Sequence, residues 1–545
     1  MGMFCFQCEQ TARGTACTSY GVCGKDPETS ALQDLLVEAT KSIGYLANLA
    51  RREGNVDIEV DRFVTEALFT TVTNVNFDQE RMEQWLRRAL AMQLQIQSKL
   101  IGDGGNGKGS LPYASTSSFD ELVRYGEGMS IEQRMTKLGA DLVGLQELLI
   151  YGLKGTAAYV THARILGYED REVYDFFHEA LAELCRSDSS IDRVLQLCLQ
   201  CGAINLRVME LLDKAHTETY GHPQPTKVRI TPIKGKAILV SGHDLKDLEE
   251  LLKQTQGKGI NIYTHGEMLP AHGYPNLKCY SHLVGNYGGA WQDQMVEFDA
   301  FPGAILMTTN CIQKPKGSYK DRIFTSGLVA WPGVEHIRNH DYSTLIDAAL
   351  AAPGFDSDQP QQEIMVGFGH NSVLGVADKI IEKVKNGAIK HFFLIGGCDG
   401  AKSGRNYYTD FARAVPEDCI IMTLACGKYR FNKYDFGAID GLPRLLDLGQ
   451  CNDAYSAIKI ATALADAFNC GVNDLPLSLI LSWYEQKAVC ILLTLLHLGL
   501  KNIKLGPSLP AAITPAALKI LVDNYNIQPL SSVENDLRGC LSQSA

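Results

Sequence analysis

The sequence lacks an apolar run long enough to cross a membrane. Its longest such stretch, residues 488–500, has 13 residues and contains His497 and Gly499, whereas a membrane-spanning helix needs about 20 apolar residues. The first ten residues, MGMFCFQCEQ, hold no basic segment followed by an apolar one, so neither a secretory nor a twin-arginine leader is expected. We therefore expect a cytoplasmic protein with no membrane partner, in which residues 488–500 form a buried helix.

Positive charge is also scarce. Lys and Arg number 51 against 62 Asp and Glu, a formal net charge of −11, so no overall basic surface is available for nucleic acid. Nucleotide-binding signatures are missing too, because the glycine-rich segment GNYGGAW (285–291) follows neither the P-loop pattern nor GxGxxG. The chain is therefore not expected to bind nucleic acid or to use NAD(P)H directly.

Cysteine, by contrast, is plentiful. The chain has 16 cysteines, and four of them lie within the first 23 residues in the spacing C-x2-C-x8-C-x5-C: Cys5, Cys8, Cys17 and Cys23. In a cytoplasmic protein such a quartet indicates a metal site and not a disulfide framework. Thiolates suit zinc or iron–sulfur clusters. If the metal is iron with sulfide, the protein moves electrons, and a second, substrate-handling centre is expected further along the chain.

Apolar residues recur at helical spacing through the first part of the chain. One such face runs from Leu32 to Leu46, with Ser30 as a candidate N-cap and Gly54 as a candidate stop. Similar patterns cover 78–100, 131–166, 173–185 and 191–215, a glycine-rich loop at 102–110 interrupts them, and no strand is expected before about residue 225. This part should be an all-helical domain of packed three-helix bundles.

The pattern changes after a Pro-, Gly- and Thr-rich segment at 217–232. Beyond it short apolar runs alternate with amphipathic helices, which predicts parallel sheets with helices on both faces. The predicted strands are 236–242, 260–266, 304–310, 363–369, 391–397, 419–425 and 502–507, and a polar segment at 353–360 separates two groups of them. We therefore predict a multidomain α and α/β protein, with a helical domain at 1–224 and two Rossmann-like α/β domains, with mainly parallel sheets, at 225–358 and 359–545.

Two pairs of segments in the predicted α/β domains resemble each other. AILVSGHD (237–244) is similar to FFLIGGCD (392–399), and AILMTTNC (304–311) is similar to CIIMTLAC (419–426). Chance similarity among short apolar strands is one explanation. The other is that two related α/β domains face each other.

Residues that bind metals follow the predicted strands. Ligands of open parallel sheets bind beyond the carboxyl ends of the strands, and there the sequence places His243, Glu267, Cys311, Cys398 and Cys426, with Cys451 and Glu485 as further candidates. A lone cysteine at a strand end is usually a small buried residue, but five such residues in equivalent places are harder to explain that way. Imidazole and carboxylate among thiolates favour iron bound to oxygen and leave positions open to substrate. The sequence therefore suggests a thiolate-only relay at the N-terminus and an asymmetric reactive centre between the α/β domains.

Long segments of the chain resemble one known family. They are the cysteine quartet, SGHDLKDLEELLKQT (241–255), YTHGEMLPA (263–271), GNYGGAW (285–291), TTNC (308–311), GGCDG (396–400), ACGKYRFNK (425–433), GQCNDAY (449–455) and WYEQKAV (483–489). This set is similar to the hybrid cluster proteins, also called prismane proteins or hydroxylamine reductases, from residue 3 to about residue 530. The family is credited with reducing hydroxylamine to ammonia and water and, in some members, nitric oxide to nitrous oxide.

The resemblance implies a cluster for each group of residues. The quartet matches the ligands of a [4Fe–4S] cluster in the family's short-spacing class. A hybrid [4Fe–2O–2S] cluster would be held by His243, Glu267, Cys311, Cys398, Cys426, Cys451 and Glu485, with a persulfide on Cys398. For catalysis we single out Cys398, Glu485 as a ligand or proton relay, and Lys487, which would supply a proton or polarise the substrate unless it is a surface salt-bridge lysine.

Other interpretations remain open from the sequence. The chain would need an external electron donor, such as an NAD(P)H-dependent reductase or a ferredoxin-like protein. A nitric oxide sensor or protein S-nitrosylase is one alternative function. A carbon monoxide dehydrogenase-like enzyme is another, although Glu267 and Glu485 favour an oxygen-bridged cluster. Cys198 and Cys201 form a C-x2-C pair inside a helical run, and we interpret them as core packing.

Overall fold

The first part of the chain is helical. The computed structural model describes residues 2–100 and 110–542, and in that part no strand precedes Thr226. The helices are α1 (Pro27–Arg52), α2 (Ile58–Thr70), α3 (Gln79–Gln97), α4 (Phe119–Glu127), α5 (Ile131–Leu138), α6 (Ala140–Ile165), α7 (Arg171–Leu184) and α8 (Ile191–Tyr220). Residues 102–109 of the predicted glycine-rich loop lie outside the described residues.

Local chemistry explains where two helix predictions were wrong. Helix α1 begins three residues before Ser30, because the Asp26 carboxylate accepts the N–H of Thr29 at 2.7 Å and Pro27 fits the first helical turn. The predicted helix 131–166 is two helices. Gly139 has φ 84° and ψ 152°, a conformation open to glycine that ends α5 and starts α6.

Two six-stranded sheets follow, and every strand pair within them is parallel. The first has the order β4-β3-β2-β5-β6-β7 and the second β13-β10-β9-β14-β15-β16. Their bounds are β2 (Lys236–Ser241), β3 (Ile260–His265), β4 (Leu283–Asn286), β5 (Ala304–Met307), β6 (Ile323–Thr325) and β7 (Glu335–His336), then β9 (His391–Gly397), β10 (Cys419–Thr423), β13 (Leu445–Asp447), β14 (Leu477–Ser482), β15 (Lys504–Gly506) and β16 (Gln528–Pro529). These sheets confirm the predicted fold class, while the domain boundaries stay predictions.

Both sheets have the same topology. Numbered by chain order within its own sheet, each reads 3-2-1-4-5-6, the order of a doubly wound nucleotide-binding fold. In each sheet the first three strands are added toward one edge and the last three toward the other edge. The switch point therefore lies between β2 and β5 in the first sheet and between β9 and β14 in the second. Segments 237–244 and 392–399 therefore occupy equivalent strands, whereas segments 304–311 and 419–426 do not. At such a switch point the strand ends leave a crevice for ligands.

One predicted strand belongs elsewhere. Within 363–369 the structure has β8 (Glu363–Val366), which pairs antiparallel with β1 (Thr226–Arg229) and not with the second sheet. Its residues alternate between exposed and buried, as in a ribbon covered on one face, whereas the central strand β9 is buried along nearly its whole length. The ribbon therefore links the two α/β parts.

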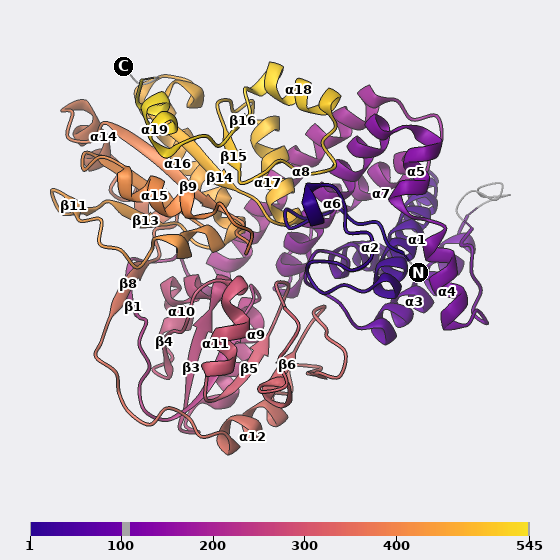
Figure 1. Ribbon diagram of the computed structural model, residues 1–545, viewed down its shortest axis with the longest axis horizontal. Coiled ribbons are helices and arrows are strands. Elements are labelled where there is room, and N and C mark those ends of the chain that lie inside the picture. The colour runs from indigo at the N-terminus through magenta and orange to yellow at the C-terminus, as the bar shows by residue number, and fades with distance from the viewer. Residues whose placement is uncertain (1, 101–109, 543–545) are drawn as a thin grey trace.

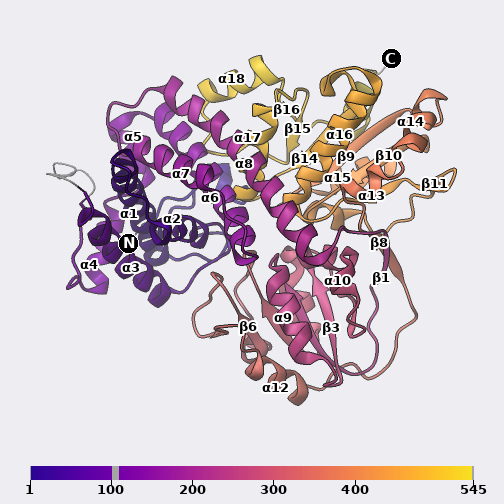
Figure 2. The same ribbon diagram turned by 180° about the vertical axis from the view of Figure 1, so that it is seen from behind.

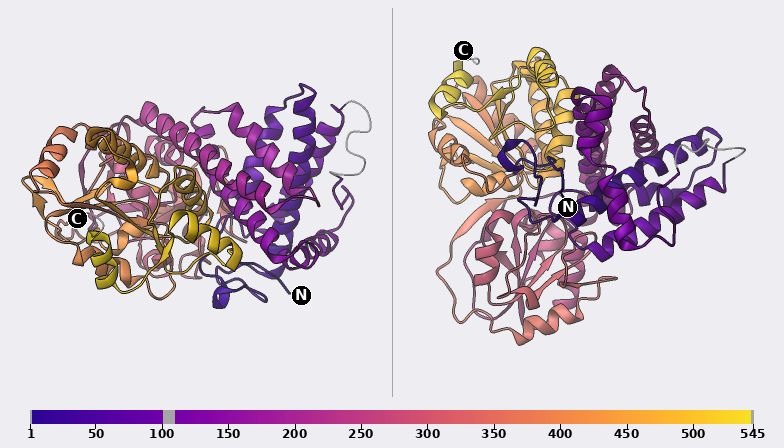
Figure 3. Two further views of the ribbon diagram at one scale, coloured as in Figure 1. Left: turned by 90° about the horizontal axis from the view of Figure 1, so that it is seen from above. Right: turned by 45° about the vertical axis from the view of Figure 1, so that its right-hand side comes forward.

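The three parts meet around the N-terminal segment. In Figure 1 the helical part lies to the right, the first sheet below and the second sheet at the upper left. Helix α8 runs from the helical part toward the first sheet (Figure 2). The indigo N-terminal segment lies where the parts meet (Figure 3, right), and the backbone N–H of Glu9 donates to the carbonyl of Tyr484 at 2.9 Å.

Helix α8 is a core helix. By length and composition it is the one helix in the described part that could span a membrane, and 44% of its most apolar window is buried within the protein. It packs against α6 and against α17 (Gln486–His497). Cys198 and Cys201 are buried in this interface, which confirms their interpretation as core packing. The apolar stretch 488–500 forms most of α17, largely buried as predicted.

Candidate functional site

Seven predicted ligands lie beyond the carboxyl ends of strands from both sheets. His243, Glu267 and Cys311 follow β2, β3 and β5, and Cys398, Cys426, Cys451 and Glu485 follow β9, β10, β13 and β14. All seven are buried. Two residues flank the switch point of each sheet, His243 and Cys311 in one and Cys398 and Glu485 in the other. The equivalent topology of the sheets thus places the two sets of side chains in one crevice.

A left-handed residue precedes several of these side chains. Gly242, Gly266 and Gly397 have φ of 121°, 57° and 112°, and Ala425 has φ 61° just before Cys426. A Cβ on Gly242 would lie 2.3 Å from Thr308 Oγ1, and one on Gly397 would lie 2.2 Å from the Ser482 carbonyl oxygen. The backbone therefore turns sharply at the strand ends, and glycine permits the turn and the close approach.

His243, Glu267 and Cys451 form the tightest group. Their candidate ligand atoms all lie within 4.8 Å of one another, with His243 Nε2 at 3.8 Å from Glu267 Oε2. The backbone N–H of Cys451 donates to Glu267 Oε2 at 2.9 Å. The other oxygen, Glu267 Oε1, is buried without a hydrogen-bond partner among the described residues. A buried acceptor of this kind fits a metal ligand.

The imidazole of His243 is neutral and held in one tautomer. Burial lowers its pKa well below the usual range, and the Lys487 ammonium and His162 lower it further. Lys487 Nζ can only donate, so His243 Nε2 accepts at 2.9 Å. The opposite nitrogen, Nδ1, then carries the proton and donates to Thr309 Oγ1 at 2.9 Å. Orientation of the outer N–H in this way is typical of metal-binding histidines.

Glu485, Cys398 and Cys311 form a second group of contacts in the crevice. Cys398 Sγ is 4.0 Å from Glu485 Oε1, and the Asn310 amide donates to Glu485 Oε1 at 3.5 Å and to Cys311 Sγ at 3.4 Å. Glu485 caps α17, because its Oε2 accepts the N–H of Lys487 at 2.9 Å. The carboxylate of Glu485 is therefore fixed at the N-terminus of α17.

Lys487 is buried, so it is not a surface salt-bridge lysine. Its Nζ lies 2.8 Å from Asn310 Oδ1 and 3.6 Å from Glu485 Oε1. Burial alone would lower its pKa, but attraction to Cys451, Glu485 and other acidic groups outweighs burial and raises the pKa. The ammonium is therefore charged at neutral pH and points into the crevice.

Burial works against the thiolate form of the crevice cysteines. Burial raises the pKa of Cys451 to about 12, and it also raises the pKa values of Cys311, Cys398 and Cys426. Thiolates form there only with a compensating positive charge, which a bound metal supplies. The donor set, with three kinds of ligand atom, fits an iron cluster of mixed ligation.

The N-terminal quartet is the second predicted site. Cys5 and Cys17 pair through both backbone hydrogen bonds, at 3.1 and 2.8 Å. Burial raises the pKa of Cys8, and the neighbouring Cys23, Cys5 and Cys17 raise it further. Four cysteines are the usual ligand set of an iron–sulfur cluster.

Tyr484 and Trp291 lie between the two sites. Their rings stack with centroids 4.4 Å apart and an interplanar angle of 29°. Both rings share one buried cluster with Cys8 of the quartet and with Cys311, Cys398 and Cys426 of the crevice. The two groups of cysteines are therefore joined by packed aromatic side chains.

Sequence reasoning missed several residues that shape the crevice. Asn310 and Thr309 lie in TTNC, and Gln450 precedes Cys451, so all three were within quoted motifs. The Gln450 amide donates to the carbonyls of Glu267 at 2.7 Å and His243 at 3.1 Å, which ties the second sheet to the first. Their position next to a predicted ligand could have drawn attention to them in the sequence. The groups that they contact could not have been identified, because most of those groups are distant in the chain.

Comparison with known proteins agrees with this geometry. The model of the Prismane/CO dehydrogenase family matches residues 3–538. The chain is 57% identical over 542 residues to a hydroxylamine reductase of Syntrophobacter fumaroxidans, covering 99% of this chain and 100% of that protein. It is also 57% identical over 553 residues to a hydroxylamine reductase of Geobacter sulfurreducens, covering 100% of both.

Solved structures with a similar fold include carbon monoxide dehydrogenases. The one called carbon monoxide dehydrogenase IV, from Carboxydothermus hydrogenoformans, has a TM-score of 0.57 and 16% identity, over 96% of this chain and 89% of that one. A nickel-free enzyme from Thermococcus sp. AM4 has a TM-score of 0.55 and 16% identity, over 96% and 87%. At this identity the likeness shows the fold alone. The family match and the full-length identities together show that the chain belongs to the Prismane/CO dehydrogenase family.

Proposed function

We propose that this protein is an iron–sulfur oxidoreductase that reduces hydroxylamine to ammonia and water. The observation that carries the proposal is the convergence of an imidazole, two carboxylates and four thiols from both sheets in one buried crevice. The full-length relatives named hydroxylamine reductase support it. The same crevice suits nitric oxide, with nitrous oxide as product.

Two clusters are proposed as cofactors. The quartet would hold a [4Fe–4S] cluster, and the seven crevice residues a hybrid [4Fe–2O–2S] cluster with a persulfide on Cys398. When bound, the clusters would supply electrons and an iron that is open to a lone pair of the substrate. The unpartnered Glu267 Oε1 and the burial-raised thiol pKa values are the features of this chain that fit such groups.

Proton supply is the task of the protein side chains. Cleavage of the N–O bond of hydroxylamine consumes two electrons and two protons and yields ammonia and water. Lys487 holds a proton at Nζ, 2.8 Å from Asn310 Oδ1, and Glu485 lies 3.6 Å away as a second carrier. A general acid within hydrogen-bond reach contributes about 10²- to 10⁴-fold to a rate.

Electrons would enter through the quartet. Cys5 and Cys23 are only partly buried, so an external donor can approach this site, while Cys8 contacts the aromatic cluster that leads to the crevice. A second connection is the hydrogen bond from the Glu9 N–H to the Tyr484 carbonyl, one residue before Glu485. An NAD(P)H-dependent reductase or a ferredoxin-like protein is the proposed donor.

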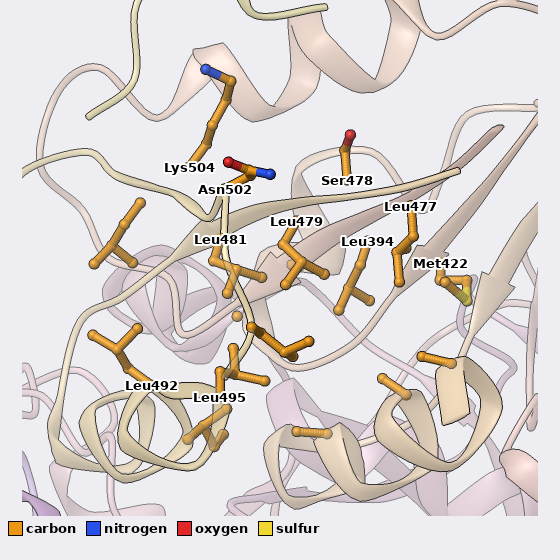
Figure 4. Close-up of a pocket in the computed structure, with 18 of the residues that line it drawn as sticks. Leu394, Met422, Leu477, Ser478, Leu479, Leu481, Leu492, Leu495, Asn502 and Lys504 are labelled. Carbon is orange, nitrogen blue, oxygen red and sulfur yellow. The ribbon is translucent and has the colours of Figure 1, made fainter. Parts of the chain in front are cut away.

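An apolar cavity favours nitric oxide as a further substrate. It has a volume of about 420 Å³, and Cys398 and Cys451 lie in its wall. Figure 4 shows leucines of the second sheet and of α17 along the cavity, with Ser478, Asn502 and Lys504 toward one end. An uncharged diatomic molecule loses little hydration in such a passage, whereas burying a polar molecule without hydrogen bonds is costly.

A variant of the cavity wall tests this second substrate. Ala457 on α16 (Ala454–Phe468) lines the cavity, so Ala457→Phe should lower kcat/KM for nitric oxide more than for hydroxylamine. The exposed Ala467 on the same helix provides the control Ala467→Phe. Equal losses for both substrates, or no loss, would contradict a selective passage.

The main proposal is tested with anaerobically purified protein. Iron and sulfide should be present at both sites, two paramagnetic centres should appear in an EPR-monitored redox titration, and hydroxylamine should yield ammonia with a reduced dye as donor. Stoichiometric nickel would instead indicate a carbon monoxide dehydrogenase-like enzyme. Reduced protein that binds nitric oxide once, without turnover of either substrate, would indicate a sensor or an S-nitrosylase.

A further inference from the structure

We propose that Arg405 is a positioning residue that couples the two centres, because its guanidinium bridges the residue after Cys8 to the residue after Cys398. The inference rests on the proposed function in taking both sites to hold iron–sulfur clusters. Arg405 lies just before α15 (Asn406–Ala414) and is only 1% exposed. Its neighbours in sequence belong to neither site.

The bridge consists of two ion pairs. Arg405 Nη2 donates to Glu9 Oε2 at 2.9 Å, and Nη1 donates to Asp399 Oδ1 at 2.8 Å. Nη2 also donates to the Trp483 carbonyl at 3.0 Å, two residues before Glu485. One rigid guanidinium therefore contacts the residue after a quartet cysteine, the residue after Cys398 and a residue two positions before Glu485.

Other groups fix the two carboxylates. Glu9 Oε1 accepts from Ser508 Oγ at 2.9 Å and lies 3.2 Å from Lys402 Nζ. Asp399 Oδ2 accepts from Arg430 Nε at 2.6 Å. Both carboxylates are completely buried, with side-chain exposure of 0%. Each acid is thus held from two sides, and Arg405 is the group common to both.

The burial of these three charged groups costs folding free energy, which suggests that they are kept for a role other than stability. Removing an arginine and two carboxylates from water carries a large desolvation penalty, and apolar residues often stabilise a protein as well or better. The low local dielectric also strengthens the effect of each charge on its surroundings. A buried guanidinium beside both sites would favour the reduced, more negative state of each cluster, and the two carboxylates would oppose it.

The coupling predicts signed changes in the midpoint potentials of both centres. Arg405→Gln removes the positive charge, so both potentials should shift to more negative values in an EPR-monitored redox titration. Glu9→Gln and Asp399→Asn each remove a negative charge and one anchor of the guanidinium. Each should shift both potentials to more positive values, Glu9→Gln more at the quartet and Asp399→Asn more at the crevice. The double variant Arg405→Gln/Glu9→Gln should return the quartet's potential toward that of the unmodified protein.

Arg444 provides the matched control. It is a buried arginine at the amino end of β13 in the second sheet, and it donates to backbone carbonyls of Cys419, Phe436, Val415 and Pro416. Arg444→Gln should leave both potentials unchanged. The iron and sulfide contents of the unmodified protein test the cluster assignment separately. Folded protein without clusters would refute the proposed function, whatever the variants show.

Three results would overturn the coupling. Folded Arg405→Gln with both potentials unchanged would do so, and so would shifts of the same size in Arg444→Gln. If Arg405→Gln does not fold, the midpoint potentials of Glu9→Gln and Asp399→Asn test the coupling instead, because each of these variants keeps one ion pair of Arg405. The bridge is refuted if each of these two variants shifts the potential of its adjacent centre alone.

Discussion

Replacing Lys487 by methionine removes the charged donor from the crevice while keeping a side chain of similar length. The ammonium lies 2.8 Å from Asn310 Oδ1 and 3.6 Å from Glu485 Oε1, so the variant loses a hydrogen bond, an ion pair and the proton that they hold in place. If Lys487 is the general acid, kcat for hydroxylamine should fall about 10²- to 10⁴-fold. That range corresponds to about 3 to 5 kcal/mol of transition-state stabilisation.

The assay compares initial rates of ammonia formation at saturating hydroxylamine, under anaerobic conditions, with iron content measured in the same samples. Lys41→Met is the control, because Lys41 is also buried but pairs with Glu38 on α1. Rescue of part of the rate by Lys487→Arg would support a role of the charge. An unchanged kcat in fully loaded Lys487→Met, or a loss of activity no greater than the loss of iron, would refute the assignment.

Other variants separate the parts of the account. Cys8→Ser should impair electron entry and the signals of the quartet while leaving much of the crevice centre assembled. Glu485→Ala should have the opposite effect, and loss of the same EPR signals in both variants would contradict the separation of roles. Burial, together with Glu210, raises the pKa of Asp213 to about 7, above its ordinary value near 3.9. The folded state therefore resists ionisation of Asp213, and its stability falls as pH rises from about 4 to about 7. Asp213→Asn should remove this loss and stabilise the protein at pH 8 by at most about 4 kcal/mol. Thermal unfolding from pH 5 to pH 8 checks the sign, and a gain that does not grow with pH would contradict it.

Much of the fold could be predicted from local patterns. Strand 236–242 was recognised because a buried central strand is apolar along its length, and α3 because its apolar residues repeat at helical spacing. Helix α2 was missed, since Ile58–Thr70 is rich in β-branched residues of lower helix propensity. The partner of β8 could not be predicted, because pairing with β1 is decided by tertiary structure.

The candidate site was predictable for a topological reason. Parallel strands bring their carboxyl ends to one edge, so residues that follow them, such as His243 and Cys398, can be grouped without coordinates. Arg405 and Gln450 could not be found in this way. The contact of Arg405 with Glu9, and the contacts of Gln450 with the carbonyls of His243 and Glu267, join residues far apart in sequence. Their importance follows from contacts that form only after the parts of the chain have assembled.

Diffraction at the iron absorption edge from anaerobically grown crystals tests the central claim most directly. The account predicts iron atoms bound by His243, Glu267 and Glu485 together with the four crevice cysteines, and a second group of iron atoms bound by the quartet. Crystals of folded protein from iron-replete cells in which these side chains diverge, with no iron among them, would contradict the account.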